Sequence, residues 1–414
     1  MSVSSVAAAA PPQLVADVRR TLNRFTAWLQ RFGASSYDHQ TFYSGAIGGT
    51  AKTLYYRNRL LGTAAVAPIV FCEAFLPGAR RLFGPMTRFP IADAHYAMGF
   101  AFLAERAGDV NHQQAVSFLE ALRASRSPGY TNYCWGYPFN WVTSRGTIEA
   151  WTPFITSTPY AYEAFREVYE IDRQDEWRSI CQSIAEHARS DIREFPVSAA
   201  ASSCGYDPYD QKGGVVNAAA YRASLLTAAS IDFGREDYRA AAERNLEFVI
   251  EAQQPNGSWF YSIDGVRDFV DHYHTCFVLK ALAKIDRRTS HAGCRAAIAR
   301  GVEYYLENLF DADGLPKPFS KAPRLTVYKR ELYDYAECIN LCVLLRDRFP
   351  ALGRTLATVV TDVLGRWVKS DGSFRSRELL AGWDNVPMHR WAQSQMFRSL
   401  AFLLHEEGVT AGNR

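Results

Sequence analysis

Two pairs of ionisable residues are spaced so that each pair shares one face of a helix. Asp271 and His274 stand three residues apart in "DFVDHYHTCF", and Asp334 and Glu337 have the same spacing in "LYDYAECIN". Residues at i and i+3 are neighbours on a helix surface. A carboxylate beside an imidazole, or beside a second carboxylate, suits general acid and base catalysis. We take all four as candidate catalytic residues; an N-cap at Asp271 and a helix-start charge pair at Asp334 are the plainer alternatives.

Polar residues also stand at the starts of other apolar helices or in the links before them. They are Asp93, His95, Asp207, Asp210, Asn217, Arg390 and Gln393. Asp93 is a fifth candidate catalytic acid, or a simple cap. The other six are candidate substrate-binding residues. For those in "GYDPYDQKGGVVNAA" a plain loop is the alternative, because Asp-Pro and Gly-Gly form turns. Arg390 is expected to pair with an anionic ligand group or with Asp384.

The elements that must position these residues are helices. Apolar residues recur at three- and four-residue spacing in stretches such as "ADVRRTLNRFTAWLQRF" and "CRAAIARGVEYYLENLF", and convincing alternating strands are almost absent. The pattern predicts an all-α protein. The predicted helices lie near 12–31, 60–77, 90–107, 111–126, 157–171, 175–191, 216–230, 235–253, 271–285, 290–309, 333–347, 351–368 and 389–406.

Short and long links alternate between these helices. Short links join antiparallel neighbours, so alternation places every long link at the same end of the molecule. Three long links begin alike, as "QPNGSWFY", "DADGLPKPF" and "KSDGSFRS", and their glycines Gly257, Gly314 and Gly372 recur at a nearly constant interval. Such a repeat predicts stacked helical hairpins, each helix ending in a left-handed glycine. We expect an (α/α)6-type toroid whose mouth is formed by the long links.

The chain resembles the six-hairpin glycosidase-like superfamily, in particular bacterial proteins associated with envelope polysaccharide biosynthesis. The matching stretches lie between about residues 88 and 406 and include "RFPIADAHYAMGFAFL", "CWGYPFNW", "TPFITSTPYAYEAF", "FVDHYHTCFVLKAL" and "MHRWAQSQMFRSLAFLL". The resemblance implies a toroid and a carbohydrate partner, an oligosaccharide or a polysaccharide precursor. It implies no agreed catalytic residues and no cofactor.

A second resemblance concerns "FVIEAQQPNGSW", which is similar to the QW element of terpenoid cyclases. Those proteins are also α-toroids, but the chain has no DxDD acid motif. We interpret Gln253 and Trp259 as residues that tie one hairpin to the next, and terpenoid chemistry as a less favoured alternative.

Aromatic residues gather in the long links. The stretch "PGYTNYCWGYPFNWVTS" contains several, and others precede or follow it. Aromatic rings stack on the apolar faces of sugars while their polar edges form hydrogen bonds. Candidate stacking residues are Tyr133, Trp135, Trp141 and Trp259; a loop that only caps the toroid is the alternative.

Acid and base groups around one mouth allow three functions. Glycoside hydrolysis needs one carboxylic acid and one carboxylate and is the leading prediction. A uronate lyase or epimerase would use a base and an acid at a sugar carbon, with His274 and a Tyr as candidates. A non-catalytic glycan-binding or assembly protein would keep the toroid and its aromatics only.

Composition excludes several other classes. The net charge is only +3, with Lys and Arg spread throughout, so the whole chain shows no footprint for nucleic acid or an acidic membrane surface. No segment has the 18 uncharged apolar residues of a membrane span. The start lacks a signal-peptide pattern, and the eight cysteines form no CxxC pair. We expect a cytoplasmic protein with reduced thiols, no metal, a loose tail over 1–11 and one toroid domain over 12–414; the oligomeric state is left open.

Overall fold

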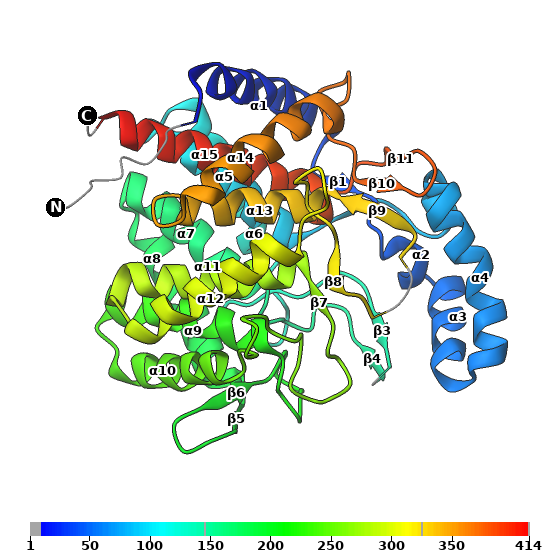
Figure 1. Cartoon of the computed structure of the whole chain (residues 1–414), viewed down its shortest axis with the longest axis horizontal. Coiled ribbons are helices and arrows are strands. Elements are labelled where there is room, and N and C mark those ends of the chain that lie inside the picture. The colour runs from blue at the N-terminus through cyan, green and yellow to red at the C-terminus, as the bar shows by residue number, and fades with distance from the viewer. Residues whose placement is uncertain (1–9, 145, 324–325, 413–414) are drawn as a thin grey trace.

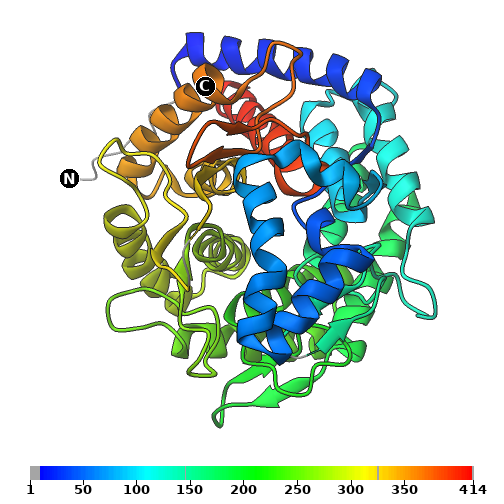
Figure 2. The same ribbon diagram turned by 90° about the vertical axis from the view of Figure 1, so that its right-hand side faces the viewer.

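Six helices form a closed inner ring in the computed structural model, which describes residues 10–144, 146–323 and 326–412. The inner helices are α5 (Pro90–Leu103), α7 (Thr158–Asp172), α9 (Val216–Phe233), α11 (His272–Thr289), α13 (Leu332–Leu345) and α15 (Ser394–Gly412). Each contacts the next, and α15 contacts α5 (Figure 2). Inner helices are covered on all sides by other elements: every residue of α13 is buried, including Asp334 and Glu337.

Six further helices surround this ring and complete the hairpins. They are α6 (Val110–Ala124), α8 (Asp175–Glu186), α10 (Glu236–Glu251), α12 (Ala292–Asn308), α14 (Pro350–Asp362) and α1 (Pro12–Phe32). Outer helices bury only one stripe, as α1 does with Val18, Leu22, Phe25 and Leu29. The N-terminal helix α1 packs on α15, so the sixth hairpin combines helices from opposite ends of the chain (Figure 1).

The repeated glycines lie in corresponding turns of three hairpins, but they do not end the helices as predicted, because the helix C-caps are Ala252, Leu309 and Val368. Gly257, Gly314 and Gly372 all have positive φ, at 88°, 73° and 96°. A Cβ on Gly257 would meet the carbonyl oxygen of Arg300 in α12 at 2.4 Å, and one on Gly372 would meet that of Arg24 in α1 at 2.6 Å. These two turns therefore pack in the same way against the outer helix of the next hairpin.

The QW element also acts as predicted. The side-chain amide of Gln253 donates to the carbonyl of Ala297 in α12 at 3.0 Å, and the indole of Trp259 donates to Val249 at 2.8 Å. The Trp259 ring also packs against Gly301 of α12, where a Cβ would meet it at 2.7 Å. Both residues therefore join neighbouring hairpins.

The long links carry short antiparallel strands. These are β3 (Trp141–Thr143) with β4 (Gly146–Ile148), β5 (Glu194–Pro196) with β6 (Ser202–Cys204), β7 (Val270–Asp271) with β8 (Phe319–Lys321), and β9 (Tyr328–Glu331), β10 (Arg377–Leu379) and β11 (Trp383–Asp384) in one sheet. Most lie at the same end of the toroid in Figure 1, as alternation of link lengths predicts. Short turns η2 (His187–Asp191) and η3 (Val363–Trp367) extend α8 and α14, and η4 (His389–Gln393) leads into α15.

A helical hairpin stands beside this mouth. It follows β1 (Ser35–Ser36), which pairs with β2 (Thr87–Arg88), and consists of α2 (Thr41–Ser44), α3 (Ala46–Arg57), α4 (Arg59–Phe75) and η1 (Pro77–Leu82). It has a small core of its own around Phe42, Ala51 and Ile69. Figure 2 shows α3 and α4, in blue, crossing in front of the ring. No helix among the described residues is long and apolar enough to cross a bilayer.

Candidate functional site

One side chain from each inner helix contributes to a closed ring around the toroid axis, here called the axial ring. Its members are His95, Tyr160, Tyr221, Phe277, Tyr333 and Gln395. The Tyr160 and Tyr221 hydroxyls are 2.6 Å apart, and the Tyr221 and Phe277 ring centroids 5.1 Å. Phe277 and Tyr333 follow at 6.1 Å. The Gln395 amide reaches the Tyr333 hydroxyl at 3.5 Å, and His95 and Tyr160 close the ring at 4.5 Å.

Two polar atoms of the axial ring lack a hydrogen-bond partner within the described part of the chain. The Gln395 amide nitrogen donates to Nε2 of His95 at 2.6 Å, which assigns the imidazole proton to Nδ1. Burial, then the nearby Arg398 and Lys280 charges, hold the pKa of His95 well below its usual value, so the ring is neutral. Nδ1 of His95 and Oε1 of Gln395 remain unpaired. A buried donor and acceptor without partners are costly, which marks them as binding groups.

A second closed circuit, here called the mouth belt, lies among the long links. Its members are Tyr261, His274, Tyr273, Trp391, Arg390, Tyr137, Phe154 and Tyr206. Successive members approach to between 4.3 and 5.7 Å, and a hydrogen bond between Tyr206 and Tyr261 closes the circuit. Tyr333 joins the two circuits, because it stacks on Trp391 at 4.4 Å.

Asp271 and His274 form one acid–base dyad in the belt. Asp271 caps α11 by accepting from the His274 backbone N–H at 2.9 Å, and its other oxygen lies 2.6 Å from Nδ1 of the same histidine. Asp271 is buried and the His274 side chain is 18% exposed. The bond at Nδ1 places the proton there, which leaves Nε2 as the basic atom. The predicted pair is thus both a cap and an oriented imidazole.

His272 points away from this dyad. Its ring nitrogens meet the Leu309 carbonyl at 3.1 Å and the Tyr305 hydroxyl at 2.8 Å, so it ties α11 to α12. Burial lowers its pKa to about 3.

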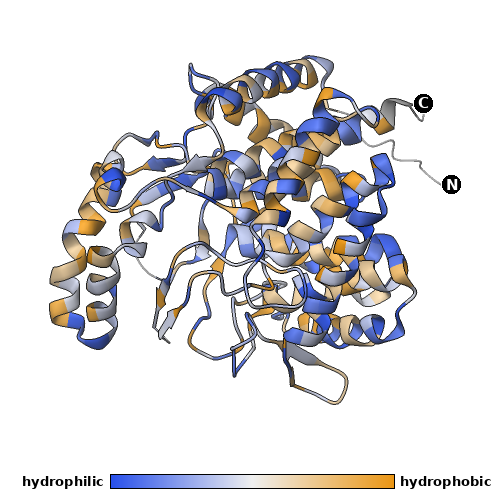
Figure 3. Cartoon of the chain, turned by 180° about the vertical axis from the view of Figure 1, so that it is seen from behind, coloured by the Kyte–Doolittle hydropathy of each residue, from blue (hydrophilic) through white to orange (hydrophobic). Residues whose placement is uncertain are grey.

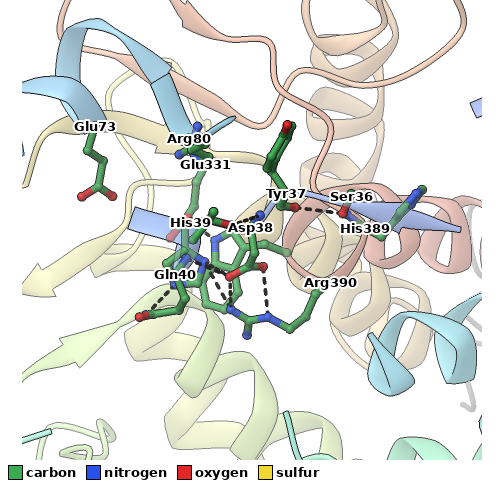
Figure 4. A network of polar contacts seen from close by, with 12 residues as sticks. Ser36, Tyr37, Asp38, His39, Gln40, Glu73, Arg80, Glu331, His389 and Arg390 are labelled. Carbon is green, nitrogen blue, oxygen red and sulfur yellow. Dashed lines mark hydrogen bonds and ion pairs between the residues drawn. The ribbon is translucent and has the colours of Figure 1, made fainter. Parts of the chain in front are cut away.

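A second dyad comes from Asp38 and His39, which follow β1 (Figure 4). Nδ1 of His39 lies 3.2 Å from Asp38, and Arg390 binds the same carboxylate with Nε at 3.0 Å and Nη2 at 2.6 Å. Burial raises the pKa of Asp38, but Arg390 and His39 outweigh it and hold that pKa far below its usual value. Burial lowers the pKa of His39 despite Asp38, so this imidazole is neutral near pH 7. Arg390 pairs with Asp38 rather than Asp384, whose partner is Arg80 at 2.8 Å.

The two dyads flank one aromatic contact. His39 packs on Trp391 with centroids 4.4 Å apart, and His274 packs on Tyr273 at 4.3 Å. Trp391 and Tyr273 are themselves 5.7 Å apart. Two oriented imidazoles therefore lie on either side of a Tyr–Trp pair at the mouth.

Acidic residues of β9 and α13 lie next to this contact. Glu331 accepts from the Trp391 indole at 2.6 Å and from Arg377 at 3.1 Å. Asp334 is fully buried, and neither of its oxygens has a hydrogen-bond partner among the described residues. Burial, then the charges of Glu331 and Asp271, raise the pKa of Asp334 well above its usual value. Its surroundings therefore favour the protonated form of Asp334.

Glu337 lies one turn deeper than Asp334 and is held by two cations. It contacts Lys280 of α11 and accepts from Arg398 of α15 at 3.2 Å, with no exposed surface. Burial lowers the pKa of Lys280 to about 8, against the attraction of Glu337. This triad joins three inner helices. Beyond it an axial cavity of about 370 Å³, lined in part by Lys280 and Arg398, opens among the inner helices.

Other predicted residues fall into two groups. Those at or beside the belt are Arg390, Trp141, whose ring lies 5.7 Å from Phe154, and Asp210, which accepts from the Tyr206 backbone at 3.0 Å. Asn217 begins α9 with a buried, unpaired oxygen.

The second group is engaged within the scaffold. Trp135 donates to the Leu122 carbonyl at 2.7 Å and Tyr133 packs on it, while Gln393 bonds both backbone groups of Phe374. Asp207 caps a turn at the Tyr209 N–H, and Trp259 joins hairpins as described above.

Asp93 has a local partner. Nε of Arg88 binds both of its oxygens, at 2.9 and 3.1 Å. Burial raises the pKa of Asp93 to about 6, with Arg88 opposing the rise. Neither axial ring nor mouth belt includes it.

Sequence reasoning did not find Asp38, His39, Glu331 or the axial-ring tyrosines. The dyad lies in "SSYDHQ", outside any periodic stretch. The three tyrosines all lie within the first two turns of an inner helix, but at different positions from its start, so no single spacing in the sequence identifies them.

The fold has solved counterparts. A cellobiose 2-epimerase from Bacillus thermoamylovorans B4167 superposes with TM-score 0.61 at 9% identity, over 78% of this chain and 88% of that one. The fold is an (α/α)6 toroid. A D-mannose isomerase (TM-score 0.58, 11% identity, 78% and 87% covered) and the GH76A α-1,6-mannanase of Salegentibacter sp. HEL1_6 (0.56, 12%, 79% and 91%) share it.

Sequence comparison gives one partial match. No protein-family model matches the chain. The chemotaxis protein methyltransferase of Escherichia coli K12 is 30% identical over 125 residues, which are 30% of this chain and span 40% of that protein.

Proposed function

We propose that the protein is a sugar epimerase or isomerase that moves a proton at a carbon next to a carbonyl group. The observation that carries this proposal is the pair of Asp–His dyads on either side of Tyr273 and Trp391. Proton abstraction and return need two groups that can each act as base and acid near neutral pH, and histidine is suited to both.

Each part of the site has a role in this reaction. The neutral imidazole of His39 takes the proton from C2 of the open-chain sugar, once the Gln40 amide that lies 3.1 Å from its Nε2 has moved aside, and the sugar becomes an enediolate. His274 in its imidazolium form then gives a proton to the enediolate, so that the two imidazoles exchange protonation states. A proton given to the opposite face of C2 yields an epimer; a proton given to C1, with the O2 proton passed to O1, yields an isomer. The unpaired atoms of His95 and Gln395 would bind hydroxyl groups, and aromatic rings of the mouth belt would contact the sugar.

The fold comparison supports the same substrate class. A cellobiose epimerase, a mannose isomerase and a mannanase share this toroid. The leading prediction from sequence was hydrolysis, with epimerisation as an alternative; the dyads reverse that order in the proposal. An envelope glycan or its precursor stays a prediction for the natural substrate.

Glycoside hydrolysis is the second candidate, on the strength of one observation. Burial, and then the charges of Glu331 and Asp271, raise the pKa of Asp334 well above its usual value, and a carboxyl group with a raised pKa can protonate the leaving oxygen in glycoside hydrolysis. The burial of Asp334 requires the sugar to reach past Tyr333.

Deuterium exchange separates these functions. The protein is incubated in D₂O with glucose, mannose, cellobiose and α-1,6-mannobiose, and C2 exchange is followed by proton NMR, with reducing ends measured in parallel. We expect exchange by the wild type, with a loss of about 100-fold or more in His274→Ala and in His39→Ala. His405→Ala, at the opposite pole, is the matched control and should keep wild-type exchange.

Two outcomes would overturn the proposal. Release of reducing ends without C2 exchange would make the protein a glycosidase. Binding of these sugars with neither exchange nor cleavage would make it a glycan-binding protein.

A further inference from the structure

The hairpin beside the mouth exposes an unusual apolar surface. On α4 the exposed side chains Leu60, Phe71 and Phe75 recur in helical register, with Ala64 and Ala67 between them. Leu60 is 86% exposed and Phe71 is 56% exposed. This stripe runs for roughly 22 Å along the helix. Figure 3 shows the outer helix of the hairpin largely in hydrophobic colours.

No charged side chain interrupts this stripe. The charged residues of α4 are Arg59, at its first position, and Glu73. Glu73 faces the toroid, where it accepts from Arg377 at 2.9 Å and from Tyr43 at 3.0 Å. The outward face of α4 is therefore uncharged along its length, and contiguous exposed apolar surfaces of this kind mark interaction sites.

The apolar surface continues past the end of α4. Leu76, Leu82 and Met86 are 53%, 76% and 47% exposed. An open hollow of about 450 Å³ adjoins them, lined by Pro77, Met86 and other largely apolar residues.

The charge of residues 41–88 indicates what kind of surface binds the apolar stripe. Residues 41–88 contain six Lys and Arg but one acidic residue, whereas the rest of the chain has 40 basic and 42 acidic residues. Two of the six, Arg80 and Arg88, pair with Asp384 and Asp93 outside the segment, so the other four carry its surface charge. The net charge of +3 for the whole chain does not reveal this local excess of basic residues. Arg57, Arg59 and Arg81 are exposed around the stripe. A second copy of the same surface would bring like charges together, which disfavours a symmetric dimer through this face.

We propose that the α3–α4 hairpin binds the surface of an anionic lipid membrane. An apolar stripe rimmed by Arg and Lys lies in the headgroup region, where apolar side chains enter the acyl boundary and cations meet acidic lipids. Glu73 links the base of the hairpin through Arg377 to Glu331 of the candidate site. The protein would therefore hold its mouth close to the membrane. This inference does not depend on the sugar chemistry.

Vesicle sedimentation tests the inference with the full chain. Vesicles of phosphatidylcholine with 40% phosphatidylglycerol are compared with pure phosphatidylcholine. We expect binding to the anionic vesicles that weakens with salt and is at least tenfold weaker on the neutral ones. Leu60→Ser/Phe71→Ser/Phe75→Ser should reduce binding at least tenfold, and Arg57→Gln/Arg59→Gln/Arg81→Gln about 100-fold, at roughly 1 kcal/mol per cation.

Controls separate this result from misfolding and from dimer formation. Val110→Ser/Ile231→Ser removes exposed apolar residues at the opposite pole and should bind like the wild type. All variants change exposed side chains, so their melting temperatures should match. Equal binding by the apolar-stripe variant and the wild type would overturn the proposal. So would a wild-type dimer in light scattering that the stripe variant abolishes, with no vesicle binding by either.

Discussion

Removing the buried carboxylate of Glu337 tests whether it belongs to the scaffold or to the chemistry. Glu337→Gln leaves Lys280 and Arg398 buried without their counter-charge. Breaking a buried ion pair by removing one partner costs about 3–5 kcal/mol. With an unfolding entropy of about 2.1 cal/mol/K per residue, a chain of 414 residues should melt roughly 3–6 °C lower.

A half-exposed pair provides the matched control. Glu163 of α7 pairs with Lys284 of α11, and their side chains are 26% and 32% exposed. Glu163→Gln should cost about 1 kcal/mol or less, because solvent screens such pairs. Both variants are compared by thermal unfolding followed by circular dichroism.

The loss in Glu337→Gln should depend on pH. The pKa of Lys280 is already lowered to about 8, and removal of Glu337 lowers it further. Folded Lys280 in the variant then loses its proton below pH 8, while the unfolded chain keeps it up to about pH 10.4. Unfolding of the variant therefore takes up a proton, so its free energy of unfolding rises with pH. The loss of stability relative to the wild type should shrink between pH 6 and 8.

Two results would refute this reasoning. If both variants melt within 1 °C of the wild type, the triad does not stabilise the ring. If Glu337→Gln loses sugar exchange at an unchanged melting temperature, Glu337 acts in the chemistry.

Two further changes probe the scaffold. His272 has a folded pKa of about 3 against an ordinary value near 6.5, so its contribution to the free energy of unfolding is complete above pH 6.5 and declines as pH falls. Between pH 6.5 and 4.5 the wild type should lose on the order of 2–3 kcal/mol more than His272→Gln in urea unfolding. Parallel curves of stability against pH for the two proteins would contradict this. Gly257→Ala should destabilise more than Gly314→Ala in the same assay, because both have positive φ but only Gly257 meets a backbone atom, the Arg300 carbonyl; equal losses would show that the contact relaxes.

The sequence could predict most of the toroid because each hairpin repeats one pattern. The period of the apolar residues and the lengths of the links predicted thirteen helices. The i, i+3 spacing predicted that Asp271 lies beside His274. Helix α3 was not predicted, since "AIGGTAKTLYYR" has two glycines and no clear apolar stripe. It forms because it packs on α4, and Gly62 permits that approach: a Cβ there would lie 2.0 Å from Tyr55.

The partners of the site residues depend on contacts between distant parts of the chain. Arg390 could pair with a ligand or with Asp384 on local grounds, yet its partner Asp38 is 352 residues away. The i, i+3 spacing also indicated that Asp334 and Glu337 act as one pair. One helical turn separates their depths, so the first meets Glu331 and Asp271 while the second meets two cations.

The sixth hairpin, which pairs α1 with α15, can fold only after α15 has been synthesised. Five hairpins can assemble as the ribosome delivers them, but α5 and α13 keep apolar faces uncovered until α15 has emerged between them. During that interval the nascent chain is an incomplete ring of helices, with exposed apolar surface at both of its ends. Chains interrupted before α15 should aggregate or recruit chaperones, whereas a permuted gene that begins at α15 and runs on into α1 would deliver this hairpin first.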